Sequence, residues 1–278
     1  MLGIKEKEWK LILRYKDIYR EREYVDYLLA TKDLANRKTL YEVGLIYKYY
    51  REQYDKQEAY DKVLEFLNEQ GIKQRGFFKK GIGNFMERVV RNNEGRKLRQ
   101  AKDIPIYKSD LEYVNNQPLS LHYRKCLFTL IVLMKIEKQL FLENKKNKNI
   151  KYRFYNASKS SLASFRKRSN IPSHVSFNKD VLPNLYSEGY LNLNTKGHVP
   201  SLEVVFLDNI ENDDEVILTL NTFQNLGLVY EYLLGENIIQ CCDCGEFAKA
   251  TNNSTKYCPH CKEVREKERH IRYNRKRK

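Results

Sequence analysis

The stretch Gln240-Cys-Cys-Asp-Cys-Gly-Glu-Phe247, followed by Lys256-Tyr-Cys-Pro-His-Cys-Lys262, decides the fold of the C-terminal region. It contains two C-x2-C pairs, Cys241 with Cys244 and Cys258 with Cys261. Each pair forms a tight knuckle whose two sulfurs can face one metal ion. Four thiolates at about 2.3 Å complete a tetrahedral shell around Zn²⁺ and leave no position for water. We therefore predict a zinc ribbon that holds one structural Zn²⁺ ion.

Two neighbours compete for the same role. Cys242 and His260 are both suitable ligands, but only the four cysteines keep matched spacing on the two sides. Iron in a site of four sulfurs stays open as an alternative. Five of the six cysteines lie after residue 240. Disulfide scaffolds distribute their cysteines more widely, so this distribution favours a reduced, cytoplasmic chain.

The segment before the cysteines predicts a winged helix-turn-helix. An apolar helix over 120–142 is followed by a strand at 151–155 and a helix that starts at Ser158. Asn170 can end that helix because Asn tolerates the left-handed conformation. A second helix then runs from 172 to Gly189, and strands at 190–193 and 202–207 flank a hairpin tip at 195–198.

In such a module the start of the second helix enters the major groove and the wing lies on the backbone. The expected base-facing residues are Ser173, His174, Ser176, Asn178 and Lys179. The expected phosphate contacts are Arg166, Lys167, Arg168, Lys196 and His198. Pro183 conflicts with a regular helix because it removes a hydrogen bond and clashes with the carbonyl of Lys179. The helix is therefore expected to be kinked or to start later.

The last 17 residues are strongly basic, with nine Lys or Arg against three Glu. Their first half can be helical, and every phosphate that they neutralise adds salt-sensitive affinity. The expected contacts in this tail are Arg269, Arg272, Arg275, Lys276, Arg277 and Lys278.

Composition points to the same class of partner. The 278 residues carry a net charge of +15, and a chain this basic usually meets a polyanion. The longest apolar run, Cys126–Met134, is far below the roughly 20 residues that cross a bilayer. We expect no membrane partner and a place in the host cytoplasm, associated with the nucleoid. A basic surface that serves only solubility stays open.

The first third reads as helices. Leu40, Val43 and Tyr47 follow a helical period, Asp55 with Glu58 fits an N-cap and N3 pair, and Asn84 is expected to open a further helix. A polar stretch at 94–103 suggests a domain boundary.

Taken together, the predicted elements indicate a mainly α chain with small β elements (α+β). Its parts are a helical N-terminal domain (1–100), a winged helix-turn-helix domain (104–210), a strand–helix connector with the zinc ribbon (211–262) and a basic tail (263–278).

Residues 104–278 resemble a family of uncharacterised proteins from Gram-positive phages and related mobile elements. The resemblance rests on Ile104–Tyr113, Phe223-Gln-Asn-Leu-Gly227, Tyr232-Leu-Leu-Gly-Glu236, the two cysteine pairs and the basic tail. The first hundred residues match more loosely. The resemblance implies a zinc-bearing, DNA-associated protein with no catalytic residues.

Together these patterns favour a non-enzymatic protein that binds double-stranded DNA in transcription control or replication. No P-loop, G-x-S-x-G or H-E-x-x-H motif is present. Two alternatives stay open: a factor that docks on a host protein such as RNA polymerase or a defence complex, and an RNA-binding protein. A second copy of this chain, forming a homodimer, is a further possible partner.

Overall fold

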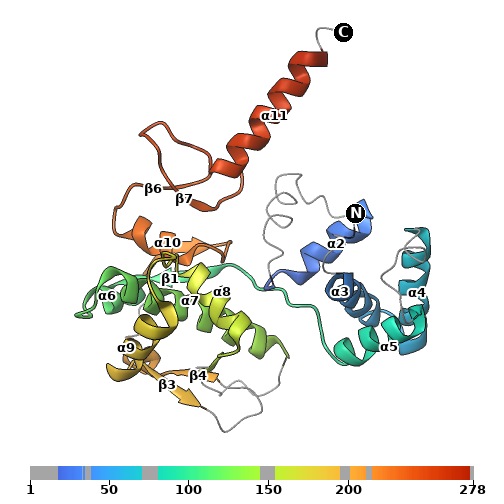
Figure 1. Ribbon diagram of the computed structural model, residues 1–278, viewed down its shortest axis with the longest axis horizontal. Coiled ribbons are helices and arrows are strands. Elements are labelled where there is room, and N and C mark those ends of the chain that lie inside the picture. The colour runs from blue at the N-terminus through green and yellow to red at the C-terminus, as the bar shows by residue number, and fades with distance from the viewer. Residues whose placement is uncertain are drawn as a thin grey trace. The chain divides into compact units, whose positions relative to one another are not determined.

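The computed structural model describes residues 18–32, 34, 39–70, 81–144, 154–194, 201–210 and 215–275. The chain divides into two compact units, residues 1–101 and 102–278. The division falls inside the polar stretch where the sequence suggests a boundary. Both units are dominated by helices, and the described residues of the second also form three small sheets (Figure 1). Within the described ranges, no helix combines the length and apolarity that a bilayer crossing requires.

The first unit is a group of helices around α3. Its described helices are α2 (Glu21–Thr31), α3 (Thr39–Arg51), α4 (Lys56–Glu69) and α5 (Ile82–Asn93). The core comes from apolar side chains that recur every three or four residues, such as Val43, Ile46 and Tyr47 of α3, all fully buried. The first described residues of the unit meet its last ones where the amide of Ala101 donates to the carbonyl of Tyr19 at 2.7 Å.

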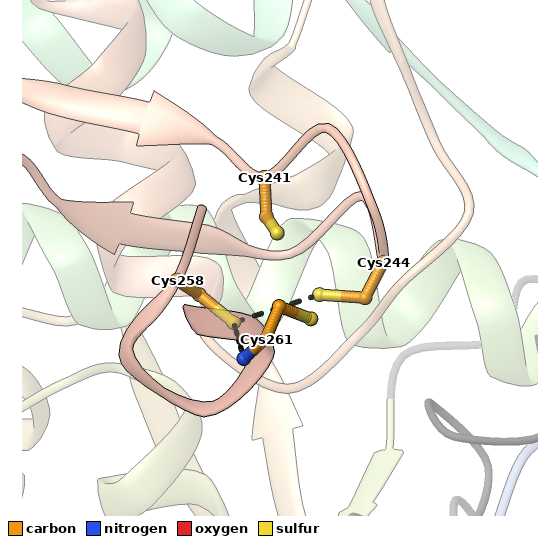
Figure 2. Close-up of side chains that lie close together, drawn as sticks. All are labelled: Cys241, Cys244, Cys258 and Cys261. Atoms are coloured by element: carbon orange, nitrogen blue, oxygen red, sulfur yellow. Dashed lines mark hydrogen bonds between the residues drawn. The ribbon is translucent and has the colours of Figure 1, made fainter. Parts of the chain in front are cut away.

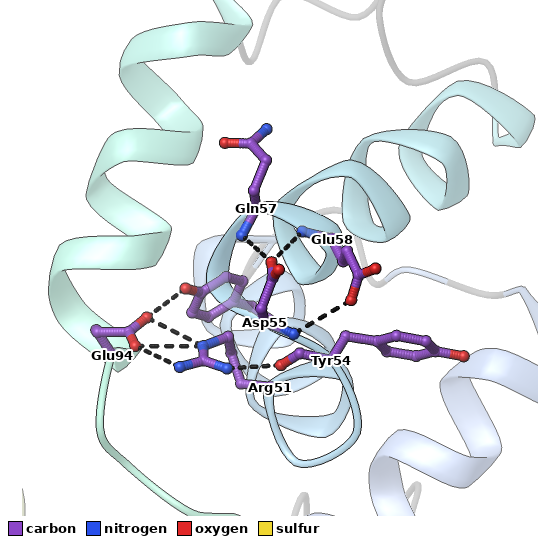
Figure 3. Close-up of polar contacts among 7 residues, drawn as sticks. Arg51, Tyr54, Asp55, Gln57, Glu58 and Glu94 are labelled. Atoms are coloured by element: carbon purple, nitrogen blue, oxygen red, sulfur yellow. Dashed lines mark hydrogen bonds and ion pairs between the residues drawn. The ribbon is translucent and has the colours of Figure 1, made fainter.

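Polar contacts fix the entry to α4 (Figure 3). The Asp55 carboxylate accepts from the amides of Gln57 and Glu58 at 2.8 and 2.9 Å, and the Glu58 side chain accepts from the Asp55 amide, so the predicted capping pair is confirmed. Beside it Arg51 pairs with Glu94 at 2.8 Å.

The predicted start of the next helix is wrong. The helix α5 begins two residues before Asn84, at Ile82, and the residue before it is Gly81 with φ of 87°. A positive φ is available to Gly at little steric cost, and this allows the chain to turn sharply into the helix.

The second unit is built on the long helix α7 (Leu121–Asn144), whose buried residues include Leu127, Phe128 and Ile131. Cys126 is fully buried among them, as expected of a core residue. Around α7 lie β1 (Ile104–Tyr107), α6 (Lys108–Asn115), β5 (Val216–Leu220) and α10 (Leu226–Leu233).

These surrounding elements make residues 102–278 one unit, so the domain division expected at residue 210 is not found. The strand β5 pairs antiparallel with β1, with Ile104 opposite Leu220. The helix α10 packs on α7, where Phe128 and Tyr230 bring their ring centroids to 5.5 Å. Segments on both sides of the expected boundary therefore share one core.

The middle of the unit alternates helices and strands. Its elements are β2 (Phe154–Asn156), α8 (Lys159–Arg168), a π-helical turn η3 (Phe177–Val181), α9 (Leu182–Ser187), β3 (Leu191–Asn194), β4 (Ser201–Val204) and a 3-10 turn η4 (Val205–Asn209). The three strands form an antiparallel sheet in the order β2-β4-β3. The return strand is thus shorter than predicted, and the expected hairpin tip lies outside the described residues.

The π turn explains how the chain accommodates Pro183. In a regular helix its ring would meet the carbonyl four residues earlier. Here the preceding turn is widened: the amide of Leu182 bonds to the carbonyl of Phe177, and α9 then starts with Pro183 in its first turn. Of the two expected outcomes, a kink or a later start, the structure has the later start, since α9 begins at Leu182 and not at residue 172.

Candidate metal centre and nucleic-acid interface

Four cysteines from two separate segments meet at one point (Figure 2). Cys241 and Cys244 lie between β6 (Ile238–Gln240) and β7 (Phe247–Lys249), whereas Cys258 and Cys261 lie at the start of α11 (Pro259–Arg275). All four sulfurs are within 4.8 Å of one another, and the sulfurs of Cys244 and Cys258 are 3.7 Å apart. A tetrahedron with bonds of about 2.3 Å has edges of about 3.8 Å. The set therefore fits a metal ion.

Backbone geometry holds each knuckle in shape. Gly245 has φ of 70°, and its amide donates to the carbonyl of Cys241 at 2.9 Å. In the second knuckle the amide of Cys261 donates to the sulfur of Cys258 at 3.5 Å. Amide donors of this kind stabilise a thiolate and orient it.

The two competing residues are not part of the cluster. Cys242 is exposed and His260 is half-buried, and the one candidate metal-binding group among the described residues contains only the four predicted cysteines. Three of the four are buried, and Cys244 is half-buried. Four protein sulfurs would fill a tetrahedral shell and leave no position for a reacting water, which is typical of a structural site.

The thiols need a cation to ionise. The hydrogen bond with the Cys258 sulfur and burial raise the pKa of Cys244, and burial raises the pKa of Cys261 to about 12. Thiols in such surroundings stay protonated at neutral pH unless a divalent cation stabilises the thiolates. The cluster is therefore suited to a bound ion and poorly suited to a free nucleophile.

Side chains of α10 and of the residue before it anchor the cysteine-bearing hairpin. Phe247 packs edge-on against Tyr232 of α10, with 5.2 Å between ring centroids. The buried carboxylate of Glu246 accepts from the side-chain amide of Asn225, the residue before α10, at 3.4 Å. The hairpin is thus attached to the helix that itself packs on α7.

An ion pair attaches α11 to the first knuckle. The guanidinium of Arg265 pairs with the carboxylate of Asp243 at 2.5 and 2.7 Å, and it lies 4.1 Å from the ring centroid of Tyr257. This pair stabilises the charged form of Arg265 and raises its pKa. Sequence reasoning missed the contact, although Asp243 lies between two ligands and Arg265 follows the last ligand by one helical turn.

The expected base-facing residues occupy one short stretch, from the turn after α8 to η3. Ser173, His174, Asn178 and Lys179 are exposed, and Ser176 is half-buried. Phe177, between them, is buried, and its ring meets Phe165 of α8 edge-on at 5.3 Å. The polar residues therefore lie on the surface of an element that packs through its apolar side.

The predicted role of Arg166 changes in the structure. Its guanidinium donates to the carbonyls of Pro172 and Val175 at 2.9 and 3.4 Å. It therefore spans the turn between the two helices and holds the exposed stretch in place. Its neighbour Lys167 is exposed, as a phosphate contact requires.

The expectation that Arg168 contacts phosphate is wrong. The residue is 4% exposed, and its guanidinium donates to Ser164 Oγ at 3.2 Å and to the carbonyl of Phe223. The bond to Phe223 joins α8 to the segment before α10. Next to it, Gly227 approaches the Ser169 carbonyl so closely that a Cβ there would lie 2.1 Å from the oxygen.

The other predicted contacts divide into two groups. Arg269 is exposed on α11, and Arg272 and Arg275 lie on the same helix, which continues further than the sequence suggests. Lys196, His198, Lys276, Arg277 and Lys278 lie outside the described residues.

Comparison with known proteins found no matching family model, no matching curated protein and no matching solved structure.

Proposed function

We propose that this chain is a non-enzymatic DNA-binding protein of a phage or related mobile element, acting in transcription control or replication. The order of α7, β2, α8, η3 with α9, β3 and β4 supports a winged helix-turn-helix. The sheet order β2-β4-β3 supports it as well, because the strand before the helices joins the edge of the hairpin that follows them.

The observation that carries the proposal is the exposed polar stretch at the start of the second helix. Asn178 and Lys179 extend from the π turn, while Phe177 and Val181 of the same turn are buried. Asn can bond adenine through two atoms, and Lys can reach the acceptors of guanine in the major groove. Ser173 and His174 precede them on the exposed turn.

The cysteine cluster supports an architectural role for a bound Zn²⁺. Cys241, Cys244, Cys258 and Cys261 would hold the ion, which would supply a cross-link between the hairpin and α11. With Arg265 and Asp243 next to it, this cross-link fixes the start of α11.

The helix α11 supports the proposal through its charge. It carries six Lys or Arg and three Glu, and Lys267 and Arg269 are exposed. A cationic helix on a fixed base adds affinity for any duplex sequence through counterion release.

Paired substitutions test the assignment. Asn178→Ala and Lys179→Ala are expected to weaken binding to the preferred duplex, each by about 1–3 kcal/mol, and to relax the preference at one base position. Asn116→Ala and Lys138→Ala provide matched controls, because both residues are exposed elsewhere in the same unit. Fluorescence anisotropy with preferred and scrambled duplexes measures both effects. An unchanged sequence preference in Asn178→Ala and Lys179→Ala would refute the recognition assignment.

A further inference from the structure

A polar cleft lies between the loop 251–257 and the first turns of α11. Five Lys or Arg side chains line it, against two Glu. The basic side chains are Lys249, Lys256, Lys262, Arg265 and Arg269. The cleft is therefore positively charged, and it is distinct from the exposed stretch 173–179.

Its three lysines are available to a ligand. Lys249, Lys256 and Lys262 are exposed, and none forms an ion pair within the described part of the chain. Arg265 differs, because its guanidinium is already engaged by Asp243. Arg265 thus forms a fixed wall of the cleft, and the three lysines supply its exposed positive charge.

The loop side of the cleft is ordered by its own hydrogen bonds. Asn252 Oδ1 accepts from the amide of Ser254 at 3.1 Å and from the hydroxyl of Thr255 at 3.0 Å. Thr255 Oγ1 in turn accepts from the amides of Thr251 and Asn252, both at 3.1 Å. A wall that is already ordered loses little conformational entropy when a ligand binds.

The lining favours backbone contact over base stacking. Its one aromatic residue is Tyr257, and the guanidinium of Arg265 covers one face of that ring at 4.1 Å from the centroid. Binding of single strands relies on open aromatic faces on which bases stack, whereas a duplex presents its phosphates outward. The cleft therefore suits the phosphates of a duplex.

We propose that this cleft binds the sugar–phosphate backbone of double-stranded DNA, with Lys249, Lys256 and Lys262 as its phosphate contacts. The inference rests on the proposed function and extends it with a second, sequence-independent contact. Each neutralised phosphate contributes about 0.9 to the slope of log K against log salt.

The test is a triple variant of the full-length, zinc-loaded chain, Lys249→Gln with Lys256→Gln and Lys262→Gln. Duplex binding is measured by anisotropy at several salt concentrations. The magnitude of the slope of log K against log salt should decrease by roughly 2 to 3. The affinity at low salt should decrease on the order of tenfold, and both changes should be equal for preferred and scrambled duplexes. The control removes the same charge from exposed lysines outside the cleft, with Lys56→Gln, Lys97→Gln and Lys138→Gln, and should leave the slope close to that of the parent.

Lysine acetylation of the parent protein, followed by mass spectrometry, gives a readout that needs no variant. Duplex DNA should slow modification of Lys249, Lys256 and Lys262 several-fold and leave Lys138 unchanged. The inference is overturned if the triple variant keeps the salt slope of the parent, or if the control variant lowers that slope equally. It is also overturned if the triple variant loses affinity only for single strands or duplex RNA. Failure of duplex DNA to protect the three lysines of the parent from acetylation would overturn it as well. A parent that binds duplex DNA but shows one of these results contradicts the cleft alone; a parent that binds no duplex contradicts the proposed function as well.

Discussion

Gly227→Ala is expected to destabilise the second unit by about 2 kcal/mol. An added Cβ would lie 2.1 Å from the Ser169 carbonyl oxygen, 2.5 Å from its carbonyl carbon and 2.9 Å from Cε of Lys125. The first two are backbone atoms that no rotamer change can move, so α10 must shift away from the turn after α8. Overpacking of this kind costs about 1–3 kcal/mol, and the higher helix propensity of Ala returns at most about 1 kcal/mol.

Gly83→Ala is the matched control. Gly83 is the second residue of α5, as Gly227 is the second residue of α10, but a Cβ at Gly83 meets nothing within 4 Å. It should therefore leave stability unchanged or raise it by up to about 1 kcal/mol.

Urea unfolding followed by circular dichroism measures both variants. With a slope of about 2 kcal/mol per molar urea, the midpoint for the second unit should fall by about 1 M in Gly227→Ala. Because this glycine packs against the turn that leads to residues 173–179, duplex affinity should fall as well. A midpoint equal to or above that of the parent would refute the close packing of α10 on this turn.

Three further predictions concern the metal, the buried ion pair and the turn. Cys258→Ser should lower bound zinc from one equivalent to well below one by elemental analysis, whereas Cys242→Ser should retain the full equivalent, because only the first is in the cluster. Lys125 Nζ pairs with the buried carboxylate of Glu231 at 2.5 Å. Lys125→Met leaves that carboxylate without its partner and should therefore lower the free energy of unfolding, measured with urea, by about 3–5 kcal/mol. A loss below about 1 kcal/mol would contradict this. Arg166→Ala should lower both the stability of the unit and its affinity for duplex DNA, because Arg166 holds the turn. Lys167→Ala should lower the affinity alone. If Lys167→Ala lowered the stability and Arg166→Ala did not, Arg166 would not hold the turn.

Features that depend on nearby residues could be predicted from the sequence. The Asp55–Glu58 capping pair spans three residues, and Asn170 and Gly189 each adopt the positive φ expected at a helix end. The cysteine spacing also predicted the four members of the metal cluster. Each C-x2-C pair is local, so only the approach of one pair to the other depends on the rest of the fold.

Features that depend on distant partners could not be predicted. Arg168 lies three residues after the buried Phe165, on the same face of α8, but its acceptor at Phe223 lies 55 residues later, so its basic side chain alone did not indicate a buried role. The pairing of β1 with β5 likewise joins segments more than a hundred residues apart, and it lies across the division expected at residue 210. The cleft of three lysines was missed because its members come from β7, a loop and α11.

Selection of bound fragments from genomic DNA, followed by titration of the zinc-loaded chain with the winning duplex and a scrambled one, tests duplex recognition most directly. We predict one enriched sequence, bound at least about a thousandfold more tightly than the scrambled duplex at physiological salt. Recovery of unrelated fragments, with equal affinities that vanish together as salt rises, would contradict sequence recognition by residues 173–179.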